Sequence, residues 1–213
     1  MIKAEPVADY KRSIEAATNR IDTALRQKGM KPYARYCAVS DGLIMLLGLT
    51  TGYRVSDLLN ARRCDIKLLR EIPHLVIEKE IKTGKRREIA LHQYVCDYII
   101  QQGEILADNF PDVPLDAFDA LPIFYNPRTE KPFTRVWVNK RLAMIIPKRL
   151  NKGRTISPHS LRKSFALTYY EHSGRDINAV RKLLNHTTTK VTQTYLDLPD
   201  EQQTLMVLAA TKV

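Results

Sequence analysis

The stretch HLVIEKEIKTGKRREIALH, residues 74–92, is where the pattern of the chain changes. Its two ends, HLVIEKEI and EIALH, are typical of strands, and the basic turn KTGKRR joins them. Helical patterns lie on both sides of this stretch, at 7–28, about 35–50, from Val55, at 93–107 and from 133 onward. The sequence therefore predicts a mainly α protein with one small antiparallel β-sheet, an α+β fold.

The segments between these elements carry the expected breaks. Residues 109–122 contain three prolines and no clear period, so we expect a loop there. The helical region after 133 is interrupted at NKGRTISP and at SGRD. Since no convincing linker divides the chain, we count one domain over 1–213, with an N-terminal helical segment at 1–30.

Composition limits the possible partners and compartments. The chain has 34 Lys and Arg against 23 Asp and Glu, a net charge of +11, which favours a polyanion such as nucleic acid as ligand. No apolar run reaches the length of about 18 residues that a membrane span needs, and the N-terminus lacks a signal-peptide pattern. Three cysteines without metal-like spacing indicate reduced structural thiols. We expect a cytoplasmic protein without a membrane partner.

Four short motifs carry residues suited to chemistry, although each also has an ordinary structural explanation. They are TGYRVSDLLNAR (51–62), KTGKRR (82–87), PHSLRKSFA (158–166) and LLNHTTTKVTQTYLDL (183–198). Arg54 and Asp57 could form a surface ion pair, Lys82 could lie at a solvated hairpin tip, and PHSLRKSFA could simply begin a helix. Taken singly, the motifs decide nothing.

Together the motifs supply the groups needed to attack a phosphodiester. A tyrosine hydroxyl can attack phosphorus and conserve the bond energy as a phosphotyrosine, provided that a base or a strongly cationic site activates it. Two arginines can bind the non-bridging oxygens, while lysine and histidine can transfer protons. This set of groups requires no metal or other cofactor, and the sequence shows no carboxylate cluster that would hold a metal.

In these motifs the chain resembles the tyrosine recombinase family of phage integrases, Xer-type recombinases and fimbrial invertases. The resemblance runs from about Gly48 to Leu198 and implies the catalytic-domain fold of that family. It implies the following catalytic residues: Arg54 and Arg162 as phosphate-binding groups, Lys82 as general acid, His159 as general base, His186 as second phosphate contact and Tyr195 as nucleophile. Asp57 would support Arg54, and the residues expected to bind DNA are Lys85, Arg86, Arg87 and Lys163.

Two departures from the family pattern stand out. The family usually has Leu-Gly-His where this chain has Leu184-Asn185-His186, and Lys163 stands where a histidine is common. Neither change removes a catalytic group. Asn185 stands at the position where glycine normally allows a close approach of the backbone before the histidine.

The resemblance also implies how the reaction is organised. Family members cut one DNA strand at a time through a 3′-phosphotyrosine and pass through a Holliday junction, so we expect double-stranded DNA as partner. We further expect a homotetramer on two DNA sites, accessory DNA-bending proteins as possible helpers, and association with the nucleoid. The tail 200–213, with Leu205–Leu208 as an apolar face, is expected to dock on a neighbour or on its own domain.

The short N-terminal region leaves two interpretations open. About 30 residues precede the catalytic pattern, so we expect no separate core-binding domain in this chain. It is either a compact recombinase, as fimbrial invertases are, or a fragment of a longer protein. The competing functions are relaxation of DNA in the manner of a type IB topoisomerase and DNA binding without catalysis.

Overall fold

The computed structural model describes residues 5–146 and 151–196. The chain divides into two compact units, Met1–Phe165 and Ala166–Val213, with the boundary inside helix α6 (Pro158–His172). Each unit is described by itself. The predicted tail at 200–213 lies outside the described residues.

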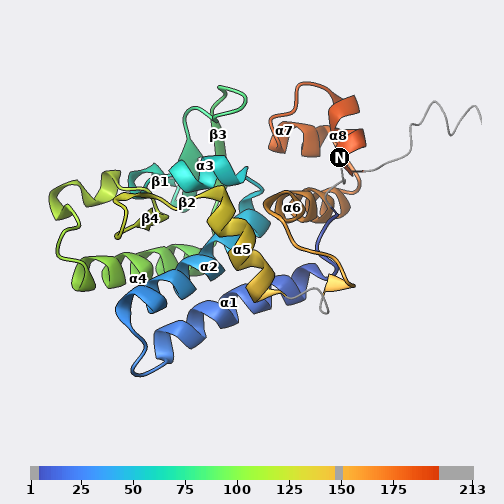
Figure 1. The fold of residues 1–213 in the computed structure, drawn as a ribbon. Coiled ribbons are helices and arrows are strands. Elements are labelled where there is room, and N and C mark those ends of the chain that lie inside the picture. The colour runs from blue at the N-terminus through green and yellow to red at the C-terminus, as the bar shows by residue number, and fades with distance from the viewer. Residues whose placement is uncertain (1–4, 147–150, 197–213) are drawn as a thin grey trace, which may run out of the picture. The chain divides into compact units, whose positions relative to one another are not determined.

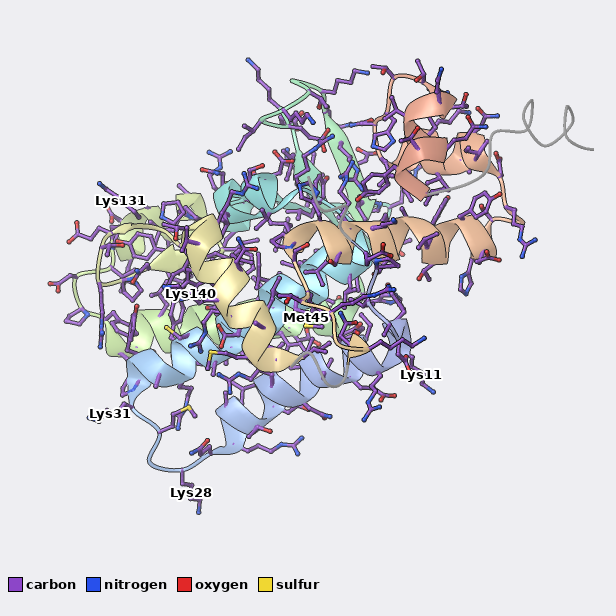
Figure 2. All side chains as sticks on the ribbon, turned by 45° about the vertical axis from the view of Figure 1, so that its right-hand side comes forward. Lys11, Lys28, Lys31, Met45, Lys131 and Lys140 are labelled. Atoms are coloured by element: carbon purple, nitrogen blue, oxygen red, sulfur yellow. The ribbon has the colours of Figure 1, made fainter. Side chains whose placement is uncertain are left out.

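The first unit is built around one buried helix. Its longer helices are α1 (Tyr10–Arg26), α2 (Pro32–Thr51), α4 (Gln93–Asn109) and α5 (Arg135–Ile145). Helices α1, α4 and α5 all pack against α2, and Figure 1 shows α1 and α2 running side by side. Because α2 is apolar on all sides, it is buried along nearly all of its length; Met45, fully buried, lies well inside the side chains drawn in Figure 2.

A buried carboxylate fixes α5 against the two helices beneath it. Asp41 of α2 has no exposed surface and accepts hydrogen bonds from Arg141 of α5, at 2.6 Å and 2.5 Å. Arg20 of α1 donates a third hydrogen bond to the same carboxylate, at 3.0 Å. Burial of a charge is tolerated only when it is paired in this way, so the position of α5 is well determined.

The predicted antiparallel sheet is present, with one strand more than the sequence indicated. Its strands are β1 (Ile66–Leu69), β2 (Ile72–Ile77) and β3 (Arg87–Ala90), in the order β1-β2-β3. In the register, Leu75 of β2 lies opposite Ile66 on one side and Ile89 on the other. The loop joining β2 and β3, residues 78–86, extends away from the helices in Figure 1.

Strand β1 was missed because its hairpin turn has unusual residues. Arg70 and Glu71 both have positive φ, of 49° and 66°. Two-residue hairpin turns of this type normally carry Asn-Gly or a similar pair, so Arg-Glu gives no turn pattern in the sequence.

The predicted helices are confirmed to within a few residues at their ends, and three short pieces join them. These pieces are α3 (Val55–Asn60) and the 3-10 helices η1 (Arg63–Asp65) and η2 (Leu115–Ala120), the last within the predicted loop 109–122. A second, two-stranded sheet pairs β4 (Tyr125–Asn126) with β5 (Lys131–Pro132). Among the described helices, none is long and apolar enough to cross a membrane.

The second unit contains the C-terminal half of α6 and two short helices, α7 (Ile177–Leu183) and α8 (Thr189–Leu196), which pack on each other. Asp176 caps α7 by accepting hydrogen bonds from the backbone N–H groups of Asn178 and Ala179. The break expected at SGRD is confirmed, since the residues between α6 and α7 include Gly174 and Arg175, both with positive φ.

Candidate active site

The C-terminal end of α2 gathers arginines in the first unit. Gly52 ends the helix with φ +59°, and a Cβ there would lie 2.2 Å from the Phe165 ring, so only glycine fits. The carbonyl of Thr51 accepts a hydrogen bond from Arg87 at 2.6 Å. The Gly52 carbonyl accepts from Arg162 at 2.5 Å and from Arg87 at 3.3 Å. Carbonyls at a helix C-terminus carry partial negative charge, which stabilises guanidinium groups there.

Arg54 joins this group two residues later. It is the N-cap residue of α3, and its side chain, 15% exposed, forms an ion pair of 3.3 Å with Glu80. Glu80 has no exposed surface and lies 3.8 Å from Arg87 as well. Asp57, expected to support Arg54, accepts a hydrogen bond at its Oδ1 from the backbone N–H of Ile81 at 2.8 Å.

The surroundings of Asp57 act on the pKa of its carboxyl in both directions. Burial raises the pKa of the Asp57 carboxyl, and the negative charge of Glu80 acts in the same direction. The Ile81 N–H and the positive charges of Arg54 and Arg162 oppose that rise in pKa. Asp57 therefore lies within electrostatic reach of both predicted phosphate-binding arginines.

Lys82 lies in the loop between β2 and β3 and is exposed. The loop closes at its base through hydrogen bonds from the Glu80 N–H to the Lys85 carbonyl, at 2.9 Å, and from the Gly84 N–H to the Glu80 carbonyl, at 2.8 Å. Gly84, with φ +67°, supplies the left-handed residue that this turn needs. These two hydrogen bonds restrain the backbone of the loop on either side of Lys82.

His159 follows Pro158 at the start of α6; the residue as a whole is exposed, although its imidazole ring is partly desolvated. Burial lowers the pKa of the His159 imidazole, and the positive charges of Arg135, Arg162, Lys82 and Arg54 lower it further. A histidine in this environment is neutral near pH 7, which is the form that can accept a proton.

The structure thus brings four predicted catalytic residues into one electrostatic environment in the first unit: Arg54, Lys82, His159 and Arg162. It also adds two residues that the sequence analysis missed. Glu80 gave no sign because a single glutamate at the end of a strand resembles any solvated charge. Arg135, at the first position of α5 and exposed, could have been noticed because a positive charge is unfavourable at a helix N-terminus.

Two of the four residues expected to bind DNA lie on the surface and two do not. Lys85 and Arg86 are exposed in the loop, as groove contacts require. Arg87 is only 5% exposed and Lys163 only 4%. The burial of Arg87 has a clear reason, since its guanidinium binds the Thr51 and Gly52 carbonyls and stacks 4.4 Å over the Tyr53 ring. These contacts argue for a structural role of Arg87.

The other two predicted catalytic residues lie together in the second unit. The rings of His186 and Tyr195 meet edge to face, with centroids 5.6 Å apart. The imidazole Nδ1 of His186 lies 3.1 Å from the hydroxyl oxygen of Thr192, one helical turn before Tyr195. These contacts hold His186 against the face of α8 that carries Tyr195.

Asn185 explains both the family's usual glycine and the tolerance of this chain for a substitute. It has φ +56°, and the N–H groups of Asn185 and His186 bind the carbonyls of Lys182 and Arg181. This is a Schellman ending of α7, in which glycine is usual and asparagine is accepted. The turn therefore delivers His186 directly after the helix end.

Comparison with known sequences identifies a family for most of this chain. Residues 23–202 match the phage integrase family. The tyrosine recombinase XerA of Thermococcus kodakarensis is 32% identical over 157 residues, covering 73% of this chain and 50% of the relative. The tyrosine recombinase XerD of Staphylococcus haemolyticus is 29% identical over 164 residues, covering 76% and 51%. The chain thus spans about half the length of these two curated relatives.

Solved structures agree in fold. The XerH site-specific recombinase bound to its difH substrate gives a TM-score of 0.66 at 19% identity, covering 98% of this chain and 53% of that one. XerA recombinase gives 0.58 at 19% identity, covering 100% and 67%. With the motifs and this fold in agreement, the chain belongs to the phage integrase family of tyrosine recombinases.

Proposed function

We propose that this chain is the catalytic part of a site-specific DNA recombinase that cuts and rejoins DNA strands through a 3′-phosphotyrosine. The observation that carries the proposal is the set of guanidinium groups at the C-terminal end of α2, with Lys82 and a neutral His159 in the same electrostatic environment. Such a site is prepared for one phosphodiester before the substrate arrives.

In the proposed reaction the Tyr195 hydroxyl oxygen attacks the scissile phosphorus and the bond from phosphorus to the 5′ oxygen breaks. His159 accepts the proton of the tyrosine, and Lys82 gives a proton to the departing 5′ oxygen. Arg54 and Arg162 bind the non-bridging oxygens as charge accumulates on them. His186 donates a hydrogen bond to the phosphate, and attack by a 5′ hydroxyl on the phosphotyrosine reverses every step.

This reaction requires Tyr195 and His186 of the second unit to meet the residues of the first unit at one phosphate. We propose that they meet on double-stranded DNA, in a tetramer that holds two DNA sites in the cytoplasm. The exposed Lys85 and Arg86 would contact the backbone beside the cleaved phosphate, where each neutralised phosphate adds to the salt dependence of binding. Single-domain organisation over 1–213 and docking of the tail 200–213 belong to the same proposal.

The test is a selection for covalent complexes. Nicked duplexes with randomised sequence are mixed with the protein, and DNA that stays attached in detergent is recovered and sequenced. A nick next to the cleavage point lets a short strand diffuse away, which traps the phosphotyrosine. We expect an attached species in the wild type and in Tyr170→Phe, the matched control, and its loss in Tyr195→Phe.

Failure of the wild type to attach to any duplex would overturn the proposal. Attachment that persists in Tyr195→Phe would overturn the assignment of the nucleophile. Two further assays on the selected site then separate recombination from topoisomerase activity. Exchange between two copies of the site supports a recombinase, whereas relaxation of supercoiled plasmid without exchange supports a type IB topoisomerase.

A further inference from the structure

Glu80 is the most deeply buried acidic group beside the candidate site, and its two carboxylate oxygens have different partners. Oε1 forms the 3.3 Å ion pair with Arg54 and lies 3.8 Å from Arg87. Oε2 accepts a hydrogen bond of 2.7 Å from the hydroxyl of Thr83. One side therefore faces Arg54, a proposed phosphate-binding residue, and the buried Arg87, and the other faces the loop that carries Lys82.

The backbone of Glu80 acts on the same loop. Its N–H and carbonyl close the turn with Lys85 and Gly84, while the next residue, Ile81, donates its N–H to Asp57. Residues 80, 81 and 83 are thus all anchored around Lys82, which is itself exposed. Because three of its near neighbours in sequence are anchored, the backbone from which the Lys82 side chain leaves the loop is restrained as well.

Stability alone is a poor explanation for a carboxylate in this position. Removing a carboxylate from water is unfavourable, and an apolar side chain in place of a buried ion pair is often neutral or stabilising. A valine or isoleucine would fill this buried position of the loop without that cost. The carboxylate does something that an apolar residue cannot do, namely bind a guanidinium and a hydroxyl at once.

We propose that Glu80 is a positioning residue that fixes the placement of Arg54 and of the loop carrying Lys82 relative to each other. Thr83 is the contact through which Glu80 acts on Lys82. This inference rests on the proposed function. The same carboxylate orients the guanidinium that binds the phosphate and anchors the loop that delivers a proton to the leaving oxygen. A shift of about 1 Å in such a group can cost about 100-fold in rate.

The test uses the site selected above, in two forms. In one the scissile phosphate has its normal bridging 5′ oxygen, and in the other sulfur replaces that oxygen. A thiolate leaves without being protonated, so sulfur removes the need for the general acid. Single-turnover cleavage of both substrates is measured for the wild type, Lys82→Ala, Glu80→Gln, Thr83→Val, Thr83→Ser and Glu78→Gln.

Thr83→Val is expected to cleave the oxygen substrate about 10- to 100-fold more slowly than the wild type and the sulfur substrate at the wild-type rate. Lys82→Ala should show the same pattern with a larger loss, about 100- to 10,000-fold. The sulfur substrate should restore the cleavage rate of Glu80→Gln only in part, since sulfur does not replace the lost contact to Arg54. Thr83→Ser keeps the hydroxyl and should cleave faster than Thr83→Val.

Glu78 is the matched control, an exposed carboxylate on the same loop that pairs with Lys67 and Arg86.

Normal cleavage of the oxygen substrate by Glu80→Gln and Thr83→Val would overturn the inference while leaving the proposed function intact. A Thr83→Val defect that sulfur does not restore, although it restores Lys82→Ala, would also overturn it. Loss of cleavage in the wild type would instead overturn the proposed function. Urea unfolding of each variant separates a displaced loop from an unfolded protein, because Thr83→Val should keep the wild-type midpoint.

Discussion

Replacement of Arg87 by methionine distinguishes a structural arginine from one that contacts DNA. Arg87 is 5% exposed and binds two backbone carbonyls, with Glu80 3.8 Å away. Glu80 keeps Arg54 as a partner when Arg87 is removed, so the main loss is the two hydrogen bonds to the Thr51 and Gly52 carbonyls. Hydrogen bonds that involve a charged group contribute about 1.5–3 kcal/mol each, so their loss costs about 3–6 kcal/mol. For a domain of this size, each kcal/mol lowers the melting temperature by about 2–4 °C, so Arg87→Met should lower it by about 6–24 °C.

The neighbouring residue provides the control. Arg86 is 52% exposed and pairs with the exposed Glu78 and Glu88, at 3.1 Å and 2.7 Å. Such pairs contribute about 0–1 kcal/mol, so Arg86→Met should change the melting temperature by no more than about 4 °C. Thermal and urea unfolding followed by circular dichroism measures both variants.

DNA binding gives the second half of the test. A lysine or arginine that contacts a phosphate contributes about one unit to the slope of log K against log salt concentration. Arg86→Met should lower that slope by about one unit, and Arg87→Met should leave it unchanged under conditions where the variant is folded. The opposite pattern, an unchanged melting temperature with a reduced slope in Arg87→Met, would refute the structural assignment of this arginine.

Two further predictions concern the pKa of His159 and the turn at Asn185. Arg135→Gln should raise the pKa of His159 by removing a positive charge, so the acidic limb of the pH–rate profile for cleavage should move to higher pH. The control is Lys140→Gln, which replaces an exposed lysine on the same helix, labelled in Figure 2, and should leave the acidic limb in place. An acidic limb that Arg135→Gln does not move would contradict the electrostatic argument. Asn185→Val should lower stability by about 1–2 kcal/mol, because a β-branched residue is strained at φ +56°, whereas Asn185→Gly should be tolerated. Thermal unfolding measures this pair, and equal stability of the two variants would count against the Schellman turn.

Much of the fold could be predicted because its patterns are local. The buried helix α2 follows from an apolar run without polar faces, and the β2–β3 hairpin follows from two strand-like segments around a basic turn. Strand β1 could not be predicted in this way. Its turn at Arg70 and Glu71 adopts positive φ with residues that do not favour it, so that tertiary packing, and not local preference, determines the conformation.

The candidate site divides along a similar line. Arg54, Lys82, His159 and Arg162 belong to motifs, and the resemblance of those motifs to the tyrosine recombinase family predicted them. Glu80 could not be selected because its role depends on contacts across 26 residues to Arg54. Arg87 belonged to a basic run whose members look alike in sequence, yet Arg86 points to solvent and Arg87 to the core, because neighbouring residues of an extended segment point to opposite sides.

The way α2 ends has a consequence for how durable the arginine cluster beside it is. A protein that keeps several positive charges together before its anionic substrate arrives must supply a counter-charge of its own. Here part of that counter-charge is peptide carbonyl, at Thr51 and Gly52. A carbonyl does not titrate in the physiological range, and a point mutation that changes the side chain leaves it in place. The position of Arg87 and Arg162 is therefore tied in part to the path of the main chain at this turn.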